Sequence, residues 1–332
     1  MSRNTLRFPQ ANRLVSAVSL ASVAGVTALG LSLAAAAQDD GVERDYQVQL
    51  PEPPDGEVTF TPPAESDLGD DEYARMVRRG RDLFLNTQEL RGENVFNDQN
   101  CANCHVDAGR LANSAPMWAA YGVYPAYRGK NDMVNTLSDR IQGCFTYSMN
   151  GKPPEKGSEP LVAIQTYMHW LATDVPNNTS IPGRSYPTVE ETDREPDREQ
   201  GAEIYANQCA VCHGDNGQGQ KVGETQVFPP LWGDGAYNWG AGMHRINTAA
   251  NFIKANMPLS KPYSLSDQQA WDVAAFVNSH ERPQDPRRRT VDSQDRTQEL
   301  FHQHHGLYGQ EIDGHRLGSH TDFGDNPDPV DG

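Results

Sequence analysis

The residues best suited to chemistry in this chain are its cysteines and the histidines beside them. Four of the five cysteines belong to two copies of the pattern Cys-x-x-Cys-His, which are Cys101-Ala102-Asn103-Cys104-His105 and Cys209-Ala210-Val211-Cys212-His213. In this pattern both thiols form thioethers with the vinyl groups of a haem, and the histidine faces the iron. A single Cys-x-x-Cys could instead be a redox disulfide or half of a zinc site. Two copies, each followed by histidine, predict two covalently bound haem c groups with His105 and His213 as iron ligands.

A haem iron held by one histidine needs a sixth ligand or keeps an open coordination position. For the second haem we expect Met257, which lies 44 residues after His213 in a Met-Pro sequence ahead of the last helix. A thioether ligand raises the reduction potential of the iron, which suits a haem that passes electrons out. A core methionine is the other interpretation. Met243, His244 and Lys254 are alternative ligands, Lys254 in some redox state of the haem.

The first motif has no Met-Pro sequence at the corresponding distance. Cys144 lies 39 residues after His105 and is the one cysteine outside the two motifs. A thiolate ligand carries negative charge, favours ferric iron and lowers the reduction potential of the haem. We therefore expect Cys144 to ligate the first iron. Met149 is a competing ligand, and a buried, unreactive cysteine is the alternative interpretation.

Positive charge gathers around Cys144 in a chain that is otherwise acidic. The sequence from Cys101 to Lys152 contains five cationic residues and only three aspartates. The cationic residues are Arg110, Arg128, Lys130, Arg140 and Lys152. Arginine presents a planar pair of donors that suits an oxyanion. Arg140 stands four residues before Cys144, so one helical turn would place both on the same face. The cluster predicts an anion site, although its members could merely pair with haem propionates.

Four apolar patterns of helical spacing surround these motifs. They are Tyr73-Met76-Val77-Gly80-Phe84, Leu161-Ile164-Met168-Leu171, Gly201-Ile204-Tyr205 and Ala270-Val273-Ala274-Val277. Ser266 and Gln269 are placed to form a capping box before the last pattern. Helix, haem motif, long loops and helix thus occur twice. This order predicts a mainly α fold of two tandem cytochrome c-type domains, each wrapped around one covalently attached haem, with an extended linker and tails.

These patterns divide the chain into six segments. Residues 1–37 are expected to be a signal peptide, 38–65 an acidic, proline-rich leader, 66–174 the first cytochrome c domain, 175–196 a linker and 197–284 the second cytochrome c domain. Residues 285–332 are polar and rich in histidine, which predicts a disordered tail, with adventitious metal binding as the alternative. Arg287, in this tail, is expected to have no role.

The N-terminus and the charge bear on compartment and partners. Arg3, Arg7 and Arg13 precede an apolar run and a stretch of small residues, an order typical of a signal peptide. An uncleaved anchor is the alternative. No later segment is apolar enough to span a bilayer, so we expect a periplasmic protein with no membrane span after cleavage. The net charge of −17 becomes −20 without the three arginines of residues 1–37, which argues against nucleic acid as a partner.

Several longer stretches resemble dihaem thiosulfate dehydrogenase, also called tetrathionate synthase. In the first half they are residues 101–105 with Ala108-Gly109-Arg110, then Ala115-Pro116-Met117-Trp118, Tyr124-Pro125-Ala126-Tyr127-Arg128, and residues 140–151. In the second half they are residues 228–233, 240–243 and 249–259. The resemblance covers roughly residues 70–282. The first domain is also similar to the haem subunit of the Sox sulfur-oxidising system.

This resemblance implies an enzyme that couples two thiosulfate ions to tetrathionate, in either direction. The axial ligands it implies are His105 and Cys144 for a catalytic haem, and His213 and Met257 for an electron-transfer haem. Electrons would leave to a small soluble c-type cytochrome or a similar periplasmic acceptor. The substrate-side arginines map onto Arg140 and onto Arg128 or Lys130.

The role of Cys144 has two alternatives, and the function of the chain has two besides thiosulfate coupling. Cys144 would either leave the iron to open a site or bond to the sulfur of the substrate. A dihaem electron carrier without substrate chemistry is the alternative function, but such a carrier would more simply use methionine than a thiolate. A Sox-type subunit that conjugates thiosulfate to a carrier protein is a third function, and the complete second domain argues against it.

Overall fold

The computed structural model describes residues 60–129, 131–177, 180–302 and 306–326. The expected signal peptide, most of the leader and Lys130 lie outside these residues. Within them the structure is mainly helical, as expected, and its strands form three two-stranded antiparallel hairpins. None of the helices in these ranges combines the length and the apolar character that crossing a bilayer requires.

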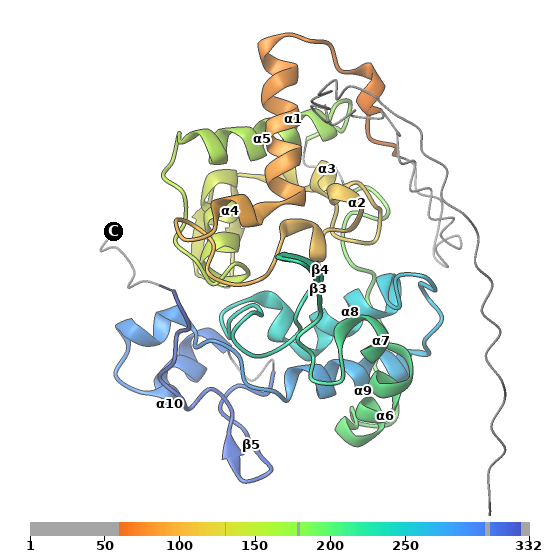
Figure 1. Cartoon of the computed structure of the whole chain (residues 1–332), viewed down its shortest axis with the longest axis vertical. Coiled ribbons are helices and arrows are strands. Elements are labelled where there is room, and N and C mark those ends of the chain that lie inside the picture. The colour runs from red at the N-terminus through yellow and green to blue at the C-terminus, as the bar shows by residue number, and fades with distance from the viewer. Residues whose placement is uncertain (1–59, 130, 178–179, 303–305, 327–332) are drawn as a thin grey trace, which may run out of the picture. The chain divides into compact units, whose positions relative to one another are not determined.

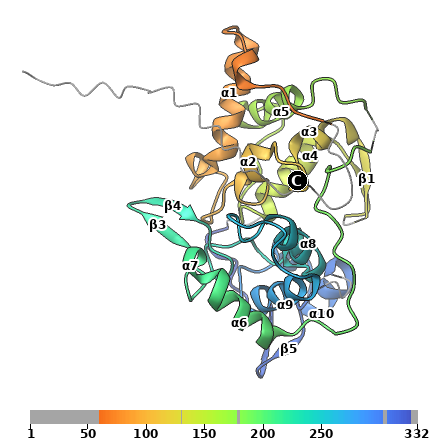
Figure 2. The same cartoon turned by 90° about the vertical axis from the view of Figure 1, so that its right-hand side faces the viewer.

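The first domain is built on the crossing of two helices (Figures 1 and 2). α1 (Glu72–Leu85) packs against α5 (Glu159–Leu171). At Gly80 an added Cβ would lie 2.0 Å from the carbonyl oxygen of Ala163, so only glycine permits this approach. The remaining elements of the domain are η1 (Glu65–Asp67), η2 (Thr87–Leu90), η3 (Cys101–Asn103), α2 (Val106–Gly109), α3 (Met117–Ala120), η4 (Tyr121–Val123), β1 (Ala126–Arg128), β2 (Met133–Asn135) and α4 (Leu137–Tyr147).

The second domain repeats this design. α6 (Arg198–Gln208) packs against α9 (Asp267–Asn278), and Gly201 stands at the crossing, where a Cβ would lie 2.1 Å from the carbonyl oxygen of Asp272. The other elements are α7 (Ala210–His213), β3 (Gln220–Val222), β4 (Thr225–Phe228), η5 (Gly242–His244) and α8 (Ile246–Asn256). Each haem motif therefore follows a helix that a second helix holds in place.

The sequence patterns describe these helices well. Ser266 and Gln269 form the expected capping box at the start of α9, because each side chain accepts a hydrogen bond from the backbone amide of the other. The four residues of the stripe on α9 are buried, and so are all four of the stripe on α5. Each stripe belongs to a separate core cluster, one for each domain.

Buried hydrogen bonds join the two domains near the end of α4. Asn97 donates to the Ala236 carbonyl at 3.0 Å, and the backbone amide of Asn238 donates to the Tyr147 carbonyl at 3.1 Å. Asn97 and Asn238 are both buried. Breaking these bonds would leave buried amides without partners, which costs free energy. The bonds therefore hold the end of α4 against the second domain.

The C-terminal segment, residues 285–326, is folded over its described length, which corrects the expectation of a disordered tail. It forms η6 (Pro286–Thr290), α10 (Gln294–Thr297), η7 (Gln298–His302) and a hairpin of β5 (Glu311–Ile312) and β6 (His315–Arg316). Tyr308 and Leu317 are buried against Trp239 of the second domain. The polar composition predicted disorder wrongly, because the groups that this segment buries are mostly polar and form hydrogen bonds and ion pairs with one another. Among the described residues no group of three or more potential metal ligands is found, and His304 and His305 lie outside them.

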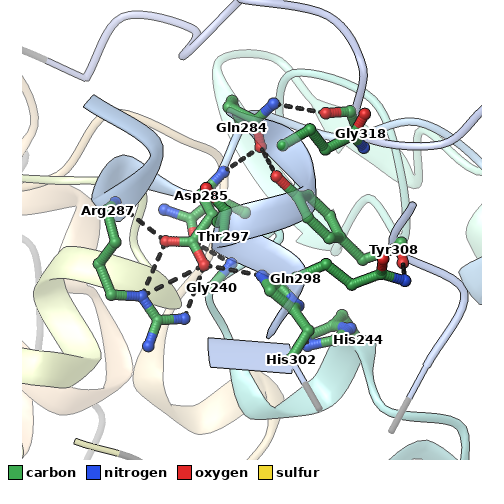
Figure 3. A network of polar contacts seen from close by, with 12 residues as sticks. Gly240, His244, Gln284, Asp285, Arg287, Thr297, Gln298, His302, Tyr308 and Gly318 are labelled. Carbon is green, nitrogen blue, oxygen red and sulfur yellow. Dashed lines mark hydrogen bonds and ion pairs between the residues drawn. The ribbon is translucent and has the colours of Figure 1, made fainter. Parts of the chain in front are cut away.

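Charged side chains pair inside this segment (Figure 3). Asp285 is fully buried, accepts a hydrogen bond from Arg287 Nη2 at 2.6 Å and lies 2.9 Å from His302 Nε2. The Arg287 guanidinium also stacks 4.9 Å from the Tyr147 ring and 4.3 Å from the Phe301 ring. Because Tyr147 belongs to α4, Arg287 connects the C-terminal segment to that helix. The expectation that Arg287 has no role was wrong.

Candidate functional site

The first haem motif lies in a tightly held turn. η3 begins at Cys101, whose amide donates to Thr87 Oγ1 at 3.0 Å, and the His105 amide donates to the Cys101 carbonyl at 3.1 Å. His105 Nδ1 donates to the Ala115 carbonyl at 2.8 Å, which leaves Nε2 for a metal. Burial lowers the pKa of His105 to about 4, so the ring is neutral, as a ligand must be. The turn has the donors and the ring orientation that haem c requires.

The second motif has the same arrangement. α6 ends directly before Cys209, and α7 carries Cys212 and His213. His213 Nδ1 donates to the Pro229 carbonyl at 3.0 Å, and burial lowers the pKa of this histidine as well. In each histidine a backbone carbonyl therefore accepts a hydrogen bond from Nδ1. This bond selects the tautomer with the proton on Nδ1 and fixes the orientation of the ring.

A cavity of about 310 Å³ brings the predicted residues of the first haem together. Cys101, Cys104 and His105 line it with Cys144 from α4. Burial raises the pKa values of Cys101 and Cys104, and the charge of the nearby Cys144 adds to the rise in both. Met149 also lines the cavity, so the competing ligand lies in the same place.

Arg140 lies one helical turn before Cys144 and lines the same cavity. Its guanidinium is densely surrounded by protein, although its surface faces the cavity and is accessible there. The charge of Cys144 raises the pKa of Arg140 more than burial lowers it, and the nearby Tyr124 hydroxyl adds to the rise. α4 begins with a capping box of Thr136 and Asp139, so the helix that places Arg140 and Cys144 has a well-defined start.

The other predicted cations separate into two groups. Arg128, the last residue of β1, is exposed and lines the cavity. Arg110 does not line it, because its guanidinium donates to the Pro63 carbonyl at 2.8 Å and lies 5.8 Å over the Trp170 ring. Lys152 is exposed and is not part of the cavity wall. Lys130 lies outside the described residues.

Met257 directly follows α8 and, like Cys209, packs against the core cluster of the second domain. The three alternative ligands have other surroundings. Lys254 Nζ donates to the Leu265 carbonyl at 2.6 Å and lies 2.8 Å from Asp267, and His244 Nε2 lies 3.2 Å from His302. Met243 lines the cavity of the first haem. Because the three alternatives contact other groups or lie at the first haem, Met257 is the favoured candidate ligand.

Sequence reasoning missed the cavity residues that come from the linker. Arg184 and Ser185 line the cavity, and Tyr186 donates from its hydroxyl to the Cys104 carbonyl at 2.9 Å. Tyr237 of the second domain also lines the cavity. The clustering of an arginine, a serine and a tyrosine in a proline-rich stretch was the one available signal. It says nothing about where the linker runs.

Two family models match the chain. The model of the SoxA/TsdA cytochrome c domain matches residues 87–176, and the model of cytochrome c oxidase, cbb3-type, subunit III, matches residues 196–277. The two matches establish two cytochrome c domains, and these imply two haem c groups. The two Cys-x-x-Cys-His turns fit those groups.

Individual relatives extend the likeness to nearly the whole chain. Thiosulfate dehydrogenase of Stutzerimonas stutzeri (strain A1501) is 51% identical over 298 residues, which are 88% of this chain and 97% of that protein. Thiosulfate dehydrogenase of Thiomonas intermedia (strain K12) is 50% identical over 78% of this chain and 82% of that protein. The solved structure of thiosulfate dehydrogenase (TsdBA) from Marichromatium purpuratum in its "as isolated" form is 50% identical, with a TM-score of 0.74 over 78% of this chain. The match spans 57% of that longer chain.

Proposed function

The chain is a member of the thiosulfate dehydrogenase family, and we propose that it joins two thiosulfate ions into tetrathionate in the periplasm. The observation that carries this proposal is that Cys144 and Arg140 line the cavity formed by the thiols and histidine of the first haem motif. An electron carrier without substrate chemistry needs neither a third thiol nor an arginine there.

The reaction sets the requirements for the site. Two thiosulfate dianions become one tetrathionate dianion as a sulfur–sulfur bond forms and two electrons leave, and no proton is gained or lost. Each haem c, when bound, supplies a one-electron acceptor. The protein must therefore hold two dianions close together and give the electrons a route out.

Arg140 and Cys144 meet the first requirement at the first haem, for which we propose His105 and Cys144 as axial ligands. The Arg140 guanidinium offers two coplanar donors, which suit the sulfonate group of thiosulfate. With the haem bound, Cys144 would either release the iron, so that the sulfur of the substrate could approach it, or form a sulfur–sulfur bond with that sulfur as two electrons leave the site. Arg140 serves both routes, because in each it holds the substrate beside the thiolate. Arg128 adds a second cation in the cavity wall, and Lys130 follows two residues later.

The second domain meets the second requirement. We propose His213 and Met257 as its axial ligands, and a thioether ligand raises the reduction potential of a haem. Electrons therefore move from the first domain to the second and on to a small soluble c-type cytochrome or a similar periplasmic acceptor. Residues 1–37 direct the chain to that compartment and are removed near Ala37.

The test uses the purified protein with both haems attached. Ferricyanide should be reduced only when thiosulfate is added, with one tetrathionate formed for two ferricyanide ions reduced. Ferricyanide reduction without tetrathionate, or none at all, would contradict the proposal. N-terminal sequencing of the protein from the periplasmic fraction checks the cleavage site.

A further inference from the structure

We propose that Arg184 of the linker, together with Arg128 of β1, forms a second anion subsite that binds the second thiosulfate ion. This inference rests on the proposed function and assigns a separate place to each of the two substrate ions. Arg140 and Cys144 form the inner position, and Arg184 and Arg128 form the outer one. Neither the family resemblance nor the charge pattern around Cys144 pointed to Arg184.

The chemistry requires more positive charge than the inner position has. Each thiosulfate carries two negative charges, and the two ions must approach to sulfur–sulfur contact. The inner position contributes one cation to the cavity wall, Arg140, which stands one helical turn before Cys144. One positive charge does not offset the four negative charges of two thiosulfate ions, so their mutual repulsion requires further cations. Arg184 and Arg128 are the other arginines that line the cavity.

Arg184 is held in place by contacts on both sides. On one side the Asn113 amide donates to the Gly183 carbonyl at 2.8 Å. On the other, the Tyr186 hydroxyl donates to the Cys104 carbonyl at 2.9 Å, and the Tyr186 ring packs 5.4 Å from that of Phe252. Cys104 belongs to the first haem motif, and Asn113 follows it closely in the chain. The linker is thus fixed to the loop that carries the first haem.

The linker holds two arginines, and they differ in what they contact. Arg194 lies 2.6 Å from the buried carboxylate of Asp272 and 3.3 Å from Asp197, so its charge is used within the protein. Arg184 is exposed, lines the cavity and has no carboxylate partner among the described residues. Tyr186, two residues on, is close enough to Arg140 that the guanidinium opposes the rise in its pKa that burial causes. The segment from 184 to 186 therefore connects the inner arginine with the outer one.

With both positions filled, the step balances without another reactant. A sulfur–sulfur bond forms between the two thiosulfate ions, each haem, when bound, would accept one of the two electrons released, and the product keeps two of the four negative charges. The loss of charge favours release, because Arg140, Arg128 and Arg184 together then face one dianion where they had held two. An arginine that instead paired with a haem carboxylate would affect the haem itself, and this difference can be measured.

The experiment compares Arg184→Gln with Arg75→Gln in the haem-loaded protein. Arg75 is an exposed arginine of α1 that pairs with Glu72, so the control removes the same charge away from the cavity. Arg184→Gln should raise the thiosulfate concentration at half-maximal turnover about tenfold, as loss of one charge-assisted hydrogen bond at an accessible site predicts. Calorimetry should show about tenfold weaker tetrathionate binding to the oxidised protein, and Arg184→Lys should recover part of both losses.

The reduction potential and the ferric resonance signal of the first haem should stay as in the wild type. A shift of either in Arg184→Gln would overturn the subsite and assign Arg184 to a haem carboxylate. Equal behaviour of Arg184→Gln and Arg75→Gln would also overturn it. If the wild type makes no tetrathionate, the proposed function fails instead, so the two failures are distinguishable.

Discussion

At the scale of single residues, the proposed chemistry depends on the role of Cys144. It lies in a cavity with two thiols whose pKa values are raised to about 12 by burial, and with a neutral histidine on the same wall. Arg140 lines the same cavity one helical turn away, and the charge of Cys144 raises its pKa. A thiolate in this position can ligate ferric iron and can also act on sulfur.

Replacing Cys144 with alanine tests the ligation. The oxidised protein should show a low-spin, thiolate-type ferric signal by paramagnetic resonance, and Cys144→Ala should remove it. Both haems should remain attached, because the four motif cysteines are unchanged. A thiolate-type signal that survives in the variant would show that another group ligates the first iron.

Replacing Arg140 with glutamine tests the inner anion position. Losing a charge-assisted hydrogen bond to a dianion should cost about 2–3 kcal/mol, or about a hundredfold in turnover. The visible haem spectrum should not change, and Arg128→Gln should have a smaller effect. Arg75→Gln is the matched control. Near wild-type turnover of Arg140→Gln at limiting thiosulfate would place the substrate elsewhere.

The sequence predicted the local part of this site and missed the rest. The sequence placed Arg140 and Cys144 together because residues four positions apart on a helix share a face, whatever the rest of the fold does. Arg184 was missed because its place depends on the path of the linker, which no spacing encodes. Arg110 was included in the cation cluster on charge alone, and its actual partners are backbone carbonyls and an indole ring.

At the scale of elements, α4 is the helix on which the proposed chemistry depends, and it is held at both ends. Its first turn is capped by Thr136, and Lys156 lies 2.6 Å from the capping Asp139. Its last residue, Tyr147, bonds to Asn238 through its carbonyl and stacks on Arg287 through its ring. The second domain and the C-terminal segment therefore both help to place Cys144.

Arg287→Ala should destabilise the protein by about 3 kcal/mol, because it leaves the buried Asp285 without its strongest partner. Urea unfolding followed by circular dichroism measures this loss. The ferric signal of the first haem should broaden, since α4 loses the stacking on Tyr147. Arg296→Gln, in the same segment, removes an exposed pair with Glu299 and should cost at most about 0.5 kcal/mol. Equal stability of the two variants would show that Arg287 does not brace the helix.

The elements themselves were predictable where apolar residues recur at helical spacing. α1, α5, α6 and α9 each carry such a pattern, and α1, α6 and α9 also begin with a capping side chain. The C-terminal segment was not predictable in this way, because its folding depends on buried ion pairs and on three apolar side chains that meet only in space. Ion pairs between residues that are far apart in the chain produce no periodic pattern in the sequence.

At the scale of the whole molecule, the two domains share one site. Tyr237 and Met243 of the second domain line the cavity of the first haem, together with the linker. Glu281, just after α9, binds the C-terminal segment back to this domain through His315 at 2.6 Å and His320 at 3.1 Å. The cavity of the first haem motif, the second domain and the C-terminal segment are therefore one connected structure.

The stability of this structure should depend on pH through Glu281 and His320. Burial opposes both charges, yet their mutual attraction and hydrogen bonds lower the pKa of Glu281 from 4.5 to about 2 and raise that of His320 above 6.5. The contribution of Glu281 is present above pH 4.5 and is lost as pH falls towards 2. The contribution of His320 is present below pH 6.5 and is lost as pH rises through its raised pKa.

The urea midpoint should therefore be highest between these limits and fall on both sides. His320→Gln should lower the midpoint near pH 6 and reduce the alkaline fall. An unchanged alkaline fall in the variant would show that other groups cause it.

The direction of electron flow is the property that only the two-domain molecule has. If Met257 ligates the second haem, Met257→Gly removes the thioether, lowers the potential of that haem and slows electron delivery to an external cytochrome. The first haem keeps His105, Cys144 and Arg140, so thiosulfate should still reduce it in a single turnover followed by stopped-flow absorption. Steady-state turnover with a cytochrome acceptor should fall much more than this single-turnover rate. A variant in which thiosulfate no longer reduces the first haem would reverse the roles assigned to the two domains, because the exit haem would then be the one that meets the substrate.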